Sequence, residues 1–225
     1  MKKAVVLLSG GIDSATALYM AKSRGFRPVA LIFDYGQRHK KEIAFARRLA
    51  KSAKCRYKII KLPLSFLSGS LIDKKIKVPV KRKPAEIKKK IPSTYVPARN
   101  IIFLSIAVSF AETSGSEAIF IGAHTEDFSG YPDCREDFFE AFKKAVSKGT
   151  KAGRRIKIFT PLINCGKKDI IKKALALGVP LGLTWSCYKG GKRPCGECDS
   201  CRFRSRAFRQ LGLEDPYLSE KRTRR

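Results

Sequence analysis

The stretch that most constrains the fold of this 225-residue chain is a glycine-rich turn near its beginning. Ala4 to Leu8 is a continuous apolar run typical of a buried strand, and Ser14 to Met20 has the composition and apolar spacing of a helix. Between them lies the turn Ser9-Gly10-Gly11-Ile12-Asp13-Ser14. Adjacent glycines let the backbone approach a ligand closely, while serine hydroxyls and the amides of a helix N-terminus donate to anions. The turn therefore predicts a phosphate site, although an ordinary strand-to-helix turn also uses paired glycines.

Strands and helices alternate along the rest of the chain. Further strands are predicted over Val29–Phe33, Cys55–Leu62, Ala118–Ala123 and Lys157–Thr160, and further helices over Glu42–Ala53, Asn100–Glu112, Phe138–Lys148 and Lys168–Leu177. This alternation is the signature of a parallel sheet with helices on both faces. Ligands of such sheets bind at the carboxyl ends of the strands. We therefore expect Asp34 and Gln37, which follow the second strand, on the same edge as the phosphate turn.

The alternation breaks between Pro63 and Pro97. Lysines cluster there and prolines interrupt them, so we expect an irregular excursion with at most one short helix. Loops of this length inside a compact domain are usually functional or disordered. Residues 68–92 are predicted to be a mobile basic flap, with plain disorder as the alternative.

The composition limits the classes of protein to which the chain can belong. A 225-residue chain that is 44% hydrophobic can form one domain with a sizeable core, and no apolar run approaches the length of a membrane helix, so a cytoplasmic protein without a membrane partner is expected. The net charge of +29 favours polyanionic partners, but the basic residues are spread along the chain, and a demand for solubility gives the same balance. We expect a single domain, 1–225, with a nucleotide-binding core over 1–180 and a C-terminal segment over 181–225.

Four of the seven cysteines lie close together in that C-terminal segment. Seven, two and two residues separate Cys187, Cys195, Cys198 and Cys201. Closely spaced pairs of this kind place four thiolates around one tetrahedral ion. The spacing predicts one structural zinc ion per chain, with an iron–sulfur cluster or unliganded core cysteines as alternatives.

A polar loop follows the strand predicted at Ala118–Ala123. Between residues 127 and 135 it brings together two carboxylates, an aromatic ring and a guanidinium. An aromatic ring can stack on a planar base while a carboxylate accepts from its N–H edge. We therefore interpret the loop as a heterocycle-binding loop with the candidate residues Asp127, Tyr131, Asp133, Cys134 and Arg135.

Together these motifs resemble one family. The first turn resembles the pyrophosphatase loop (PP-loop) of the N-type ATP pyrophosphatases, which adenylate a carboxyl or carbonyl oxygen. The turn and four further segments together resemble the 7-cyano-7-deazaguanine synthase (QueC) family, and the four segments are Tyr95–Asn100, Ser129–Arg135, Thr160–Leu162 with Lys167, and Ser186–Cys201. The resemblance extends from the first strand to Asp215-Pro216, nearly the whole chain.

The resemblance implies a fold and an activity. The fold is a Rossmann-like α/β fold of the HUP (adenine nucleotide alpha hydrolase-like) type, with a C-terminal zinc-binding helical segment. The activity is that of an ATP-dependent carbon–nitrogen ligase that converts 7-carboxy-7-deazaguanine and ammonia to the nitrile preQ0, with ATP and Mg²⁺, in queuosine or archaeosine biosynthesis. A homodimer is expected, and a nucleic acid is not required.

The resemblance also implies roles for individual residues. Asp13, Arg99 and Lys167 are the implied catalytic residues: Asp13 helps to hold a divalent cation, and the two basic residues contact phosphate or the activated carboxyl. The residues of the 127–135 loop would hold the deazapurine, and the four cysteines would hold zinc. The implied ATP-binding residues are Leu8, Ser9, Gly10, Gly11, Ile12, Asp13, Ser14, Ala15, Thr16, Ala17 and Leu18.

The chain departs from the family pattern in places, and other functions stay open. Ala98 stands where the family commonly has glycine, Ile163 to Gly166 differs from bacterial members, and the basic stretch Lys74–Lys90 matches no motif. One alternative is a PP-loop enzyme that modifies tRNA, and another is a relative that attaches the activated carboxylate to a different amine. A third is a zinc-stabilised nucleic-acid-binding module without turnover.

Overall fold

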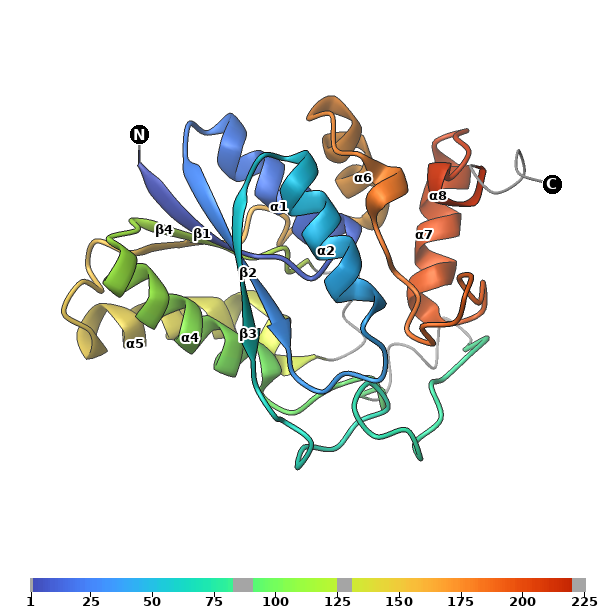
Figure 1. Ribbon diagram of the computed structural model, residues 1–225, viewed down its shortest axis with the longest axis horizontal. Helices are drawn as coiled ribbons and strands as arrows, with labels where there is room; N and C mark the ends of the chain where they lie inside the picture. The colour runs from blue at the N-terminus through green and yellow to red at the C-terminus, as the bar shows by residue number, and fades with distance from the viewer. Residues whose placement is uncertain (1, 83–90, 125–130, 220–225) are drawn as a thin grey trace.

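The sheet of this protein is parallel throughout. The computed structural model describes residues 2–82, 91–124 and 131–219 (Figure 1). The strands are β1 (Lys3–Leu7), β2 (Arg27–Asp34), β3 (Arg56–Lys61), β4 (Ala118–Phe120) and β5 (Lys157–Phe159), in the spatial order β3-β2-β1-β4-β5. β1 is central, and four of its five residues are buried because helices cover both faces of the sheet.

Helices form a layer on each side of the sheet, as predicted. α1 (Ile12–Ser23), α2 (Lys41–Ser52) and α6 (Lys167–Ala176) pack on one face, and α4 (Arg99–Ser114) and α5 (Glu136–Gly149) pack on the other (Figure 1). Successive side chains of a strand point to opposite faces of the sheet, so the strands contribute to a hydrophobic core on each face. Val6 belongs to the core beneath α1, α2 and α6, and Val5 to the core beneath α4 and α5. Each predicted strand and helix is present, and the α/β fold is confirmed.

The chain order places a crevice beside β1. From β1 the chain passes to β2 and then to β3 on one side of the sheet, and the connecting helices α1 and α2 lie on one face. It then returns through α4 to β4, which lies on the other side of β1. Two loops therefore diverge at the carboxyl ends of β1 and β4, which is the usual ligand position in open α/β sheets. The sequence-derived phosphate turn lies at this switch point.

The C-terminal segment adds a third small layer. It contains the 3₁₀ turn η3 (Leu181–Leu183) and the helices α7 (Asp199–Gln210) and α8 (Pro216–Ser219), and α7 packs against α6. The buried Arg204 fixes the segment, because its Nε and Nη2 donate to the two oxygens of Asp215 at 2.6 and 2.7 Å, and its Nη1 donates to Thr184 Oγ1 at 2.8 Å. None of the helices in the described ranges has both the length and the apolar character needed to cross a bilayer.

Residues 62–82 contain no helix or strand, and the side chain of Arg38, from the loop after β2, holds part of this segment. The guanidinium of Arg38 donates to three carbonyl oxygens of this segment: Ser70 at 3.1 Å, Lys74 at 2.7 Å and Ile76 at 3.1 Å. These bonds give the irregular backbone the partners that secondary structure would otherwise provide. The described part of the predicted flap is therefore anchored to the core. Residues 83–90 lie outside the described ranges.

Ala98 adopts a backbone conformation that suits glycine. It precedes α4 with φ 54° and ψ 19°, and its amide donates to the Tyr95 hydroxyl at 3.1 Å. A residue with a Cβ atom is strained in this left-handed region. The departure from the family pattern at this position thus places strain directly before Arg99.

Replacing Ala98 with glycine should stabilise the protein. Relief of the left-handed strain outweighs the greater freedom of glycine in the unfolded chain, which leaves a net gain of roughly 0.5–1 kcal/mol. Urea unfolding measures the free energy of unfolding. The control is Ala44→Gly on the exposed side of α2, which should cost roughly 0.5–1 kcal/mol. A loss for Ala98→Gly equal to that of the control would contradict the strain argument.

Candidate functional site

A cavity of about 250 Å³ opens at the switch point of the sheet. The phosphate turn, the loops after β2 and β4, the start of α4 and the segment around Cys187 form its walls. Five residues of the turn line it: Ser9, Gly11, Ile12, Asp13 and Ser14. The cavity thus lies where the sequence predicts a phosphate ligand.

Hydrogen bonds within the turn fix its shape. The Ser14 hydroxyl accepts from the Ser9 amide at 3.2 Å and lies 3.1 Å from the Gly11 carbonyl oxygen, to which it donates. Gly10 has φ 89°, and a Cβ atom on it would lie 2.5 Å from the Glu42 carbonyl oxygen, so only glycine fits between the turn and α2. Gly11, which precedes α1, offers no side-chain cap, and the amides of the first helical turn are therefore placed to donate to an anion.

The remaining predicted nucleotide residues have a different position. Leu8, Ala15, Ala17 and Leu18 belong to the hydrophobic core, and the Thr16 hydroxyl donates to the Ile12 carbonyl oxygen at 2.8 Å. None of these five lines the cavity. Their contribution to a ligand is to hold the turn in place.

Asp13, Lys167 and His124 meet at one wall of the cavity. Lys167 Nζ lies 2.9 Å from both oxygens of Asp13 and 2.9 Å from His124 Nε2. Lys167 is only 8% exposed. Burial by itself raises the pKa of the Asp13 carboxyl, but Lys167 and His124 outweigh it and hold that pKa well below its ordinary value. Asp13 is thus a carboxylate at neutral pH, and its charge is balanced within the wall.

Close approach of β4 makes this cluster. Gly122 follows β4, and a Cβ atom there would lie 2.6 Å from the backbone carbon of Asp13. The absence of a side chain lets the loop that bears His124 lie against the phosphate turn. The sequence analysis did not single out His124, and the available signal was its position two residues after a glycine at a strand end.

Arg99 also lines the cavity, together with Tyr35 and Glu42. Its Nη1 donates to the Tyr35 hydroxyl at 3.2 Å. Burial, together with the charge of Glu42, raises the pKa of Tyr35 to about 12. Burial also raises the pKa of Glu42 to about 7, against the opposing effects of Arg99 and of a hydrogen bond from Gln37. Both Tyr35 and Glu42 line the cavity, and neither was a candidate from the sequence.

The predicted heterocycle loop divides between two positions. Tyr131 and Cys134 line the cavity, and Asn100 Nδ2 lies 3.1 Å from Cys134 Sγ. Asp133 instead accepts from the Asn100 amide at 2.9 Å, which caps the start of α4, and Arg135 is exposed beyond the cavity. Asp127 lies outside the described residues. The structure therefore brings two of the four described loop residues to the cavity.

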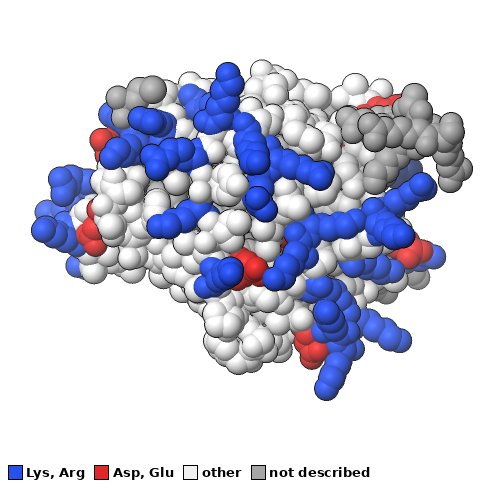
Figure 2. All heavy atoms as spheres, viewed as in Figure 1, with Lys and Arg blue, Asp and Glu red and all other residues white. Residues whose placement is uncertain are grey.

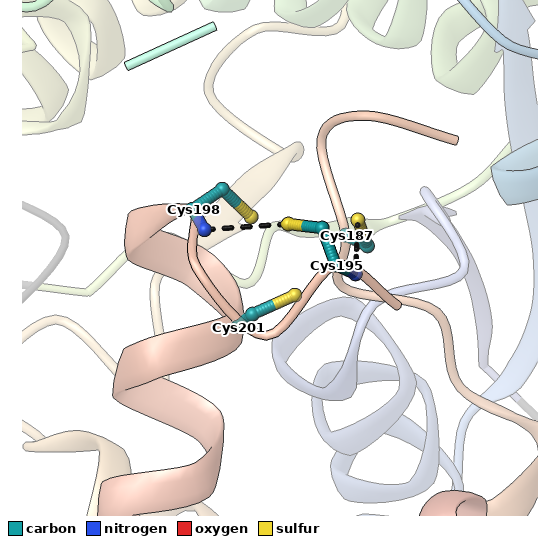
Figure 3. Close-up of side chains that lie close together, drawn as sticks. All are labelled: Cys187, Cys195, Cys198 and Cys201. Atoms are coloured by element: carbon teal, nitrogen blue, oxygen red, sulfur yellow. Dashed lines mark hydrogen bonds between the residues drawn. The ribbon is translucent and has the colours of Figure 1, made fainter. Parts of the chain in front are cut away.

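The four cysteines converge on one point (Figure 3). Their sulfur atoms all lie within 4.8 Å of one another, and the amides of Cys195 and Cys198 each donate to a cysteine sulfur at 3.3 Å. A single ion at about 2.3 Å from each sulfur would place the sulfurs about 3.8 Å apart. A four-iron cluster holds its thiolates on separate iron atoms, farther apart. The donor set and its spacing therefore fit one metal ion.

The cysteine segment is bonded both to the cavity and to the excursion. The Trp185 amide donates to the Gly10 carbonyl oxygen at 2.8 Å, and Trp185 Nε1 donates to the Cys187 carbonyl oxygen at 2.7 Å. On the other side, Val80 forms a backbone bridge with Cys198, and Arg82 Nε donates to Asp199 Oδ2 at 2.9 Å. The segment that contains the four cysteines thus connects the phosphate turn to residues 62–82.

Basic side chains are scattered over the face shown in Figure 2. Lys and Arg side chains project from several separate parts of this face and do not form one continuous stripe. A stripe or groove of basic residues is the usual footprint of a nucleic-acid site. On this face the high net charge does not outline such a site.

Comparison with known proteins gives consistent results. The model of the QueC family, described as queuosine biosynthesis protein QueC, matches residues 3–212. The chain is 51% identical over 222 residues to the 7-cyano-7-deazaguanine synthase of Thermoplasma acidophilum, covering 98% of this chain and 93% of that one. It is 49% identical to the enzyme of the same name from Acetivibrio thermocellus, covering 99% and 100%.

Solved structures give the fold. A 4-thiouridine synthetase–RNA complex with bound ATP superposes with a TM-score of 0.52 at 21% identity, covering 98% of this chain and 53% of that one. At this identity the likeness shows a shared fold. That fold belongs to a protein that binds ATP.

The Asp13–Lys167 pair should give the protein acid-sensitive stability. Because folding lowers the Asp13 pKa, the stability from this group is fully present above the unfolded value of about 4 and is lost as pH falls below it. In Lys167→Met the burial of Asp13 is no longer opposed by lysine, so its contribution to stability should decline less over the same range. Urea unfolding between neutral pH and about pH 3 measures this. Lys168→Met, exposed on α6, is the matched control and should keep the wild-type profile.

Removal of a metal ion bound at the four cysteines should be visible at the only tryptophan of the chain. Trp185 is buried beside Cys187, and its indole donates within the cysteine segment. Treatment with a chelator should shift its fluorescence emission to the red, because the segment loses the ion that holds its four thiolates together. Readdition of zinc should reverse the shift. Cys165→Ser, outside the cluster, should respond as wild type does, and an emission unchanged by complete metal removal would contradict the assignment.

Proposed function

The chain belongs to the QueC family of queuosine biosynthesis proteins, and from that premise we propose that it converts 7-carboxy-7-deazaguanine and ammonia to 7-cyano-7-deazaguanine at the expense of ATP. The observation that supports this most directly is about 50% identity to synthases of that name over nearly the entire chain. The cavity agrees with the proposal, because it combines a phosphate turn with an aromatic-lined wall at one switch point.

The first part of the reaction is activation of the carboxylate. The turn Ser9–Ser14 and the amides at the start of α1 bind the phosphates of ATP, and Asp13 would help to hold the Mg²⁺ that screens their charge. An oxygen of the substrate carboxylate attacks the α-phosphorus of ATP, a P–O bond to the adenylyl group forms, and pyrophosphate leaves with the electron pair of the bond that breaks. Lys167 and Arg99, which both line the cavity, stabilise the negative charge that develops on the phosphate oxygens.

The second part forms the nitrile. Ammonia attacks the activated carbonyl carbon, a C–N bond forms, and the bond to the nucleotide phosphate breaks to leave an amide. The amide oxygen is then activated by a second ATP. The C–O bond breaks, the oxygen leaves as part of the phosphate group, and the nitrogen loses its two protons to give the nitrile. The Tyr131 and Cys134 side chains contact the deazapurine, and both residues line the same cavity as the phosphate turn.

We assign the ion at the four cysteines as a structural zinc. Four protein ligands leave no open position for a substrate, and thiolate sulfur suits zinc. The ion holds the segment that contains Trp185 against Gly10, and so it helps to build a wall of the cavity. The proposed setting is a cytoplasmic homodimer, and light scattering on purified protein tests the dimer.

A tRNA-modifying enzyme of the same superfamily is the second candidate. The net charge of +29 and the fold shared with an RNA-bound thiouridine synthetase favour it. The two candidates differ in their dependence on salt, because binding to RNA weakens steeply as salt rises, whereas binding of a small base does not.

A mass-resolved assay tests the proposed function. With ATP, magnesium, ammonium and 7-carboxy-7-deazaguanine, the wild-type protein should form the nitrile, and Asp13→Ala should lower its rate roughly 100-fold or more, since it removes a group at the phosphate site. Asp169→Ala, an exposed carboxylate on α6, is the control and should leave the rate unchanged. ATP consumption that ends at an amide, or at a conjugate with another amine, would support the fold and the turn but overturn the product.

A further inference from the structure

Two carboxylates line the cavity among the residues that the structure describes, and they stand in contrasting surroundings. Asp13 has both oxygens at 2.9 Å from Lys167 Nζ. Glu42 comes from the first turn of α2 and does not belong to the Asp13 cluster. The mechanism described above gives Asp13 a role at the phosphates and leaves Glu42 without one.

Packing of α2 on the phosphate turn sets the position of Glu42. The Glu42 carbonyl oxygen would lie 2.5 Å from a Cβ atom on Gly10, so the backbone of residue 42 lies directly behind the turn. Its side chain lines the cavity and interacts with Gln37. The charged and titratable groups that act on it are Arg99 from α4 and Tyr35 from the loop after β2.

The second half of the reaction requires a group of this kind. At neutral pH ammonia is present mostly as ammonium, which has no lone pair with which to attack a carbonyl carbon. The cavity also presents several cationic side chains, including Lys167, Arg99 and Arg38, and these repel ammonium. A carboxylate near the reacting carbon would attract ammonium and accept its proton.

We propose that Glu42 binds ammonium in the cavity and takes one proton from it, so that neutral ammonia attacks the activated carboxyl. This inference rests on the proposed function. In the step, an N–H bond of ammonium breaks and an O–H bond forms on Glu42. The nitrogen lone pair then forms the C–N bond, and the C–O bond to phosphate breaks with its electron pair on oxygen. The second proton leaves nitrogen to that phosphate or to water, and Glu42 returns its proton to solvent.

The surroundings of Glu42 suit this exchange. A carboxyl whose pKa lies near the working pH can both accept and release a proton, and general bases in enzymes are commonly tuned in this way. Burial in the cavity wall moves Glu42 into that range, with Arg99 opposing the shift. Asp13, held by Lys167, stays ionised and is less able to accept a proton from ammonium.

Hydroxylamine provides the decisive test, because it is uncharged at neutral pH and attacks activated carboxyls without first losing a proton. The experiment compares wild-type protein with Glu42→Gln. One assay measures nitrile formation as a function of ammonium, and the other measures hydroxamate formation from 7-carboxy-7-deazaguanine, ATP and hydroxylamine. Glu42→Gln should lower kcat/KM for ammonium roughly 100-fold or more, as expected for loss of a general base, while its hydroxamate rate stays close to wild type.

The controls separate the explanations. Asp34→Asn removes a carboxylate that pairs with Lys40 at 3.2 Å outside the cavity, and it should affect neither assay. Glu42→Asp keeps the charge and should recover part of the ammonium-dependent rate. Equal losses in the two assays would overturn the inference, since they would mean that Glu42 positions Arg99 or holds the substrate. If the wild-type protein forms neither nitrile nor hydroxamate, the proposed function itself fails.

Discussion

The contact on which the cavity most depends is the buried pair between Lys167 and Asp13. A lysine that is 8% exposed is stable in its charged form only beside an anion, and Asp13 provides both of its oxygens at 2.9 Å. The pair joins the start of α6 to the start of α1, across 154 positions of sequence. Because Asp13 belongs to the phosphate turn, this pair also fixes the direction in which the turn faces.

The C-terminal segment completes the same cavity from the other side. Its contribution depends on two separate anchors, the Arg204–Asp215 pair and the cysteine cluster, and between them lies the Trp185 amide bonded to Gly10. The segment also packs apolar side chains against the rest of the protein, among them Leu181, Trp185 and Phe208. A metal ion held by the four thiolates would add a further constraint on this segment and would have a structural role beside the cavity.

Local patterns in the sequence predicted those features of the structure that are set by residues close together in the chain. The apolar run at Ala4 to Leu8 predicted a buried strand, and the spacing of the four cysteines predicted that their sulfur atoms converge. His124 and Glu42 escaped prediction because they enter the cavity only through tertiary contacts. Gly122 allows the approach of the β4 loop to Asp13, and Gly10 allows the approach of α2. Within residues 62–82, three carbonyl oxygens accept hydrogen bonds from Arg38, which is distant in the sequence. The spacing of apolar residues along the chain cannot indicate such bonds.

The contrast between Asp13 and Glu42 follows from charge and burial in one small space. Both are acidic groups at the carboxyl edge of the same sheet, but Lys167 is a direct hydrogen-bonding partner of Asp13, whereas Arg99 acts on Glu42 without overcoming its burial. Two carboxyl groups whose environments move their pKa values in opposite directions can divide two tasks between them. A permanently charged group suits a site for a cation and phosphates, and a group that exchanges protons near neutral pH suits a nitrogen nucleophile. An enzyme that binds a polyanion and also deprotonates a cation in one cavity can use both kinds of carboxylate, and here they come from different helices, since Asp13 lies in the first turn of α1 and Glu42 in the first turn of α2.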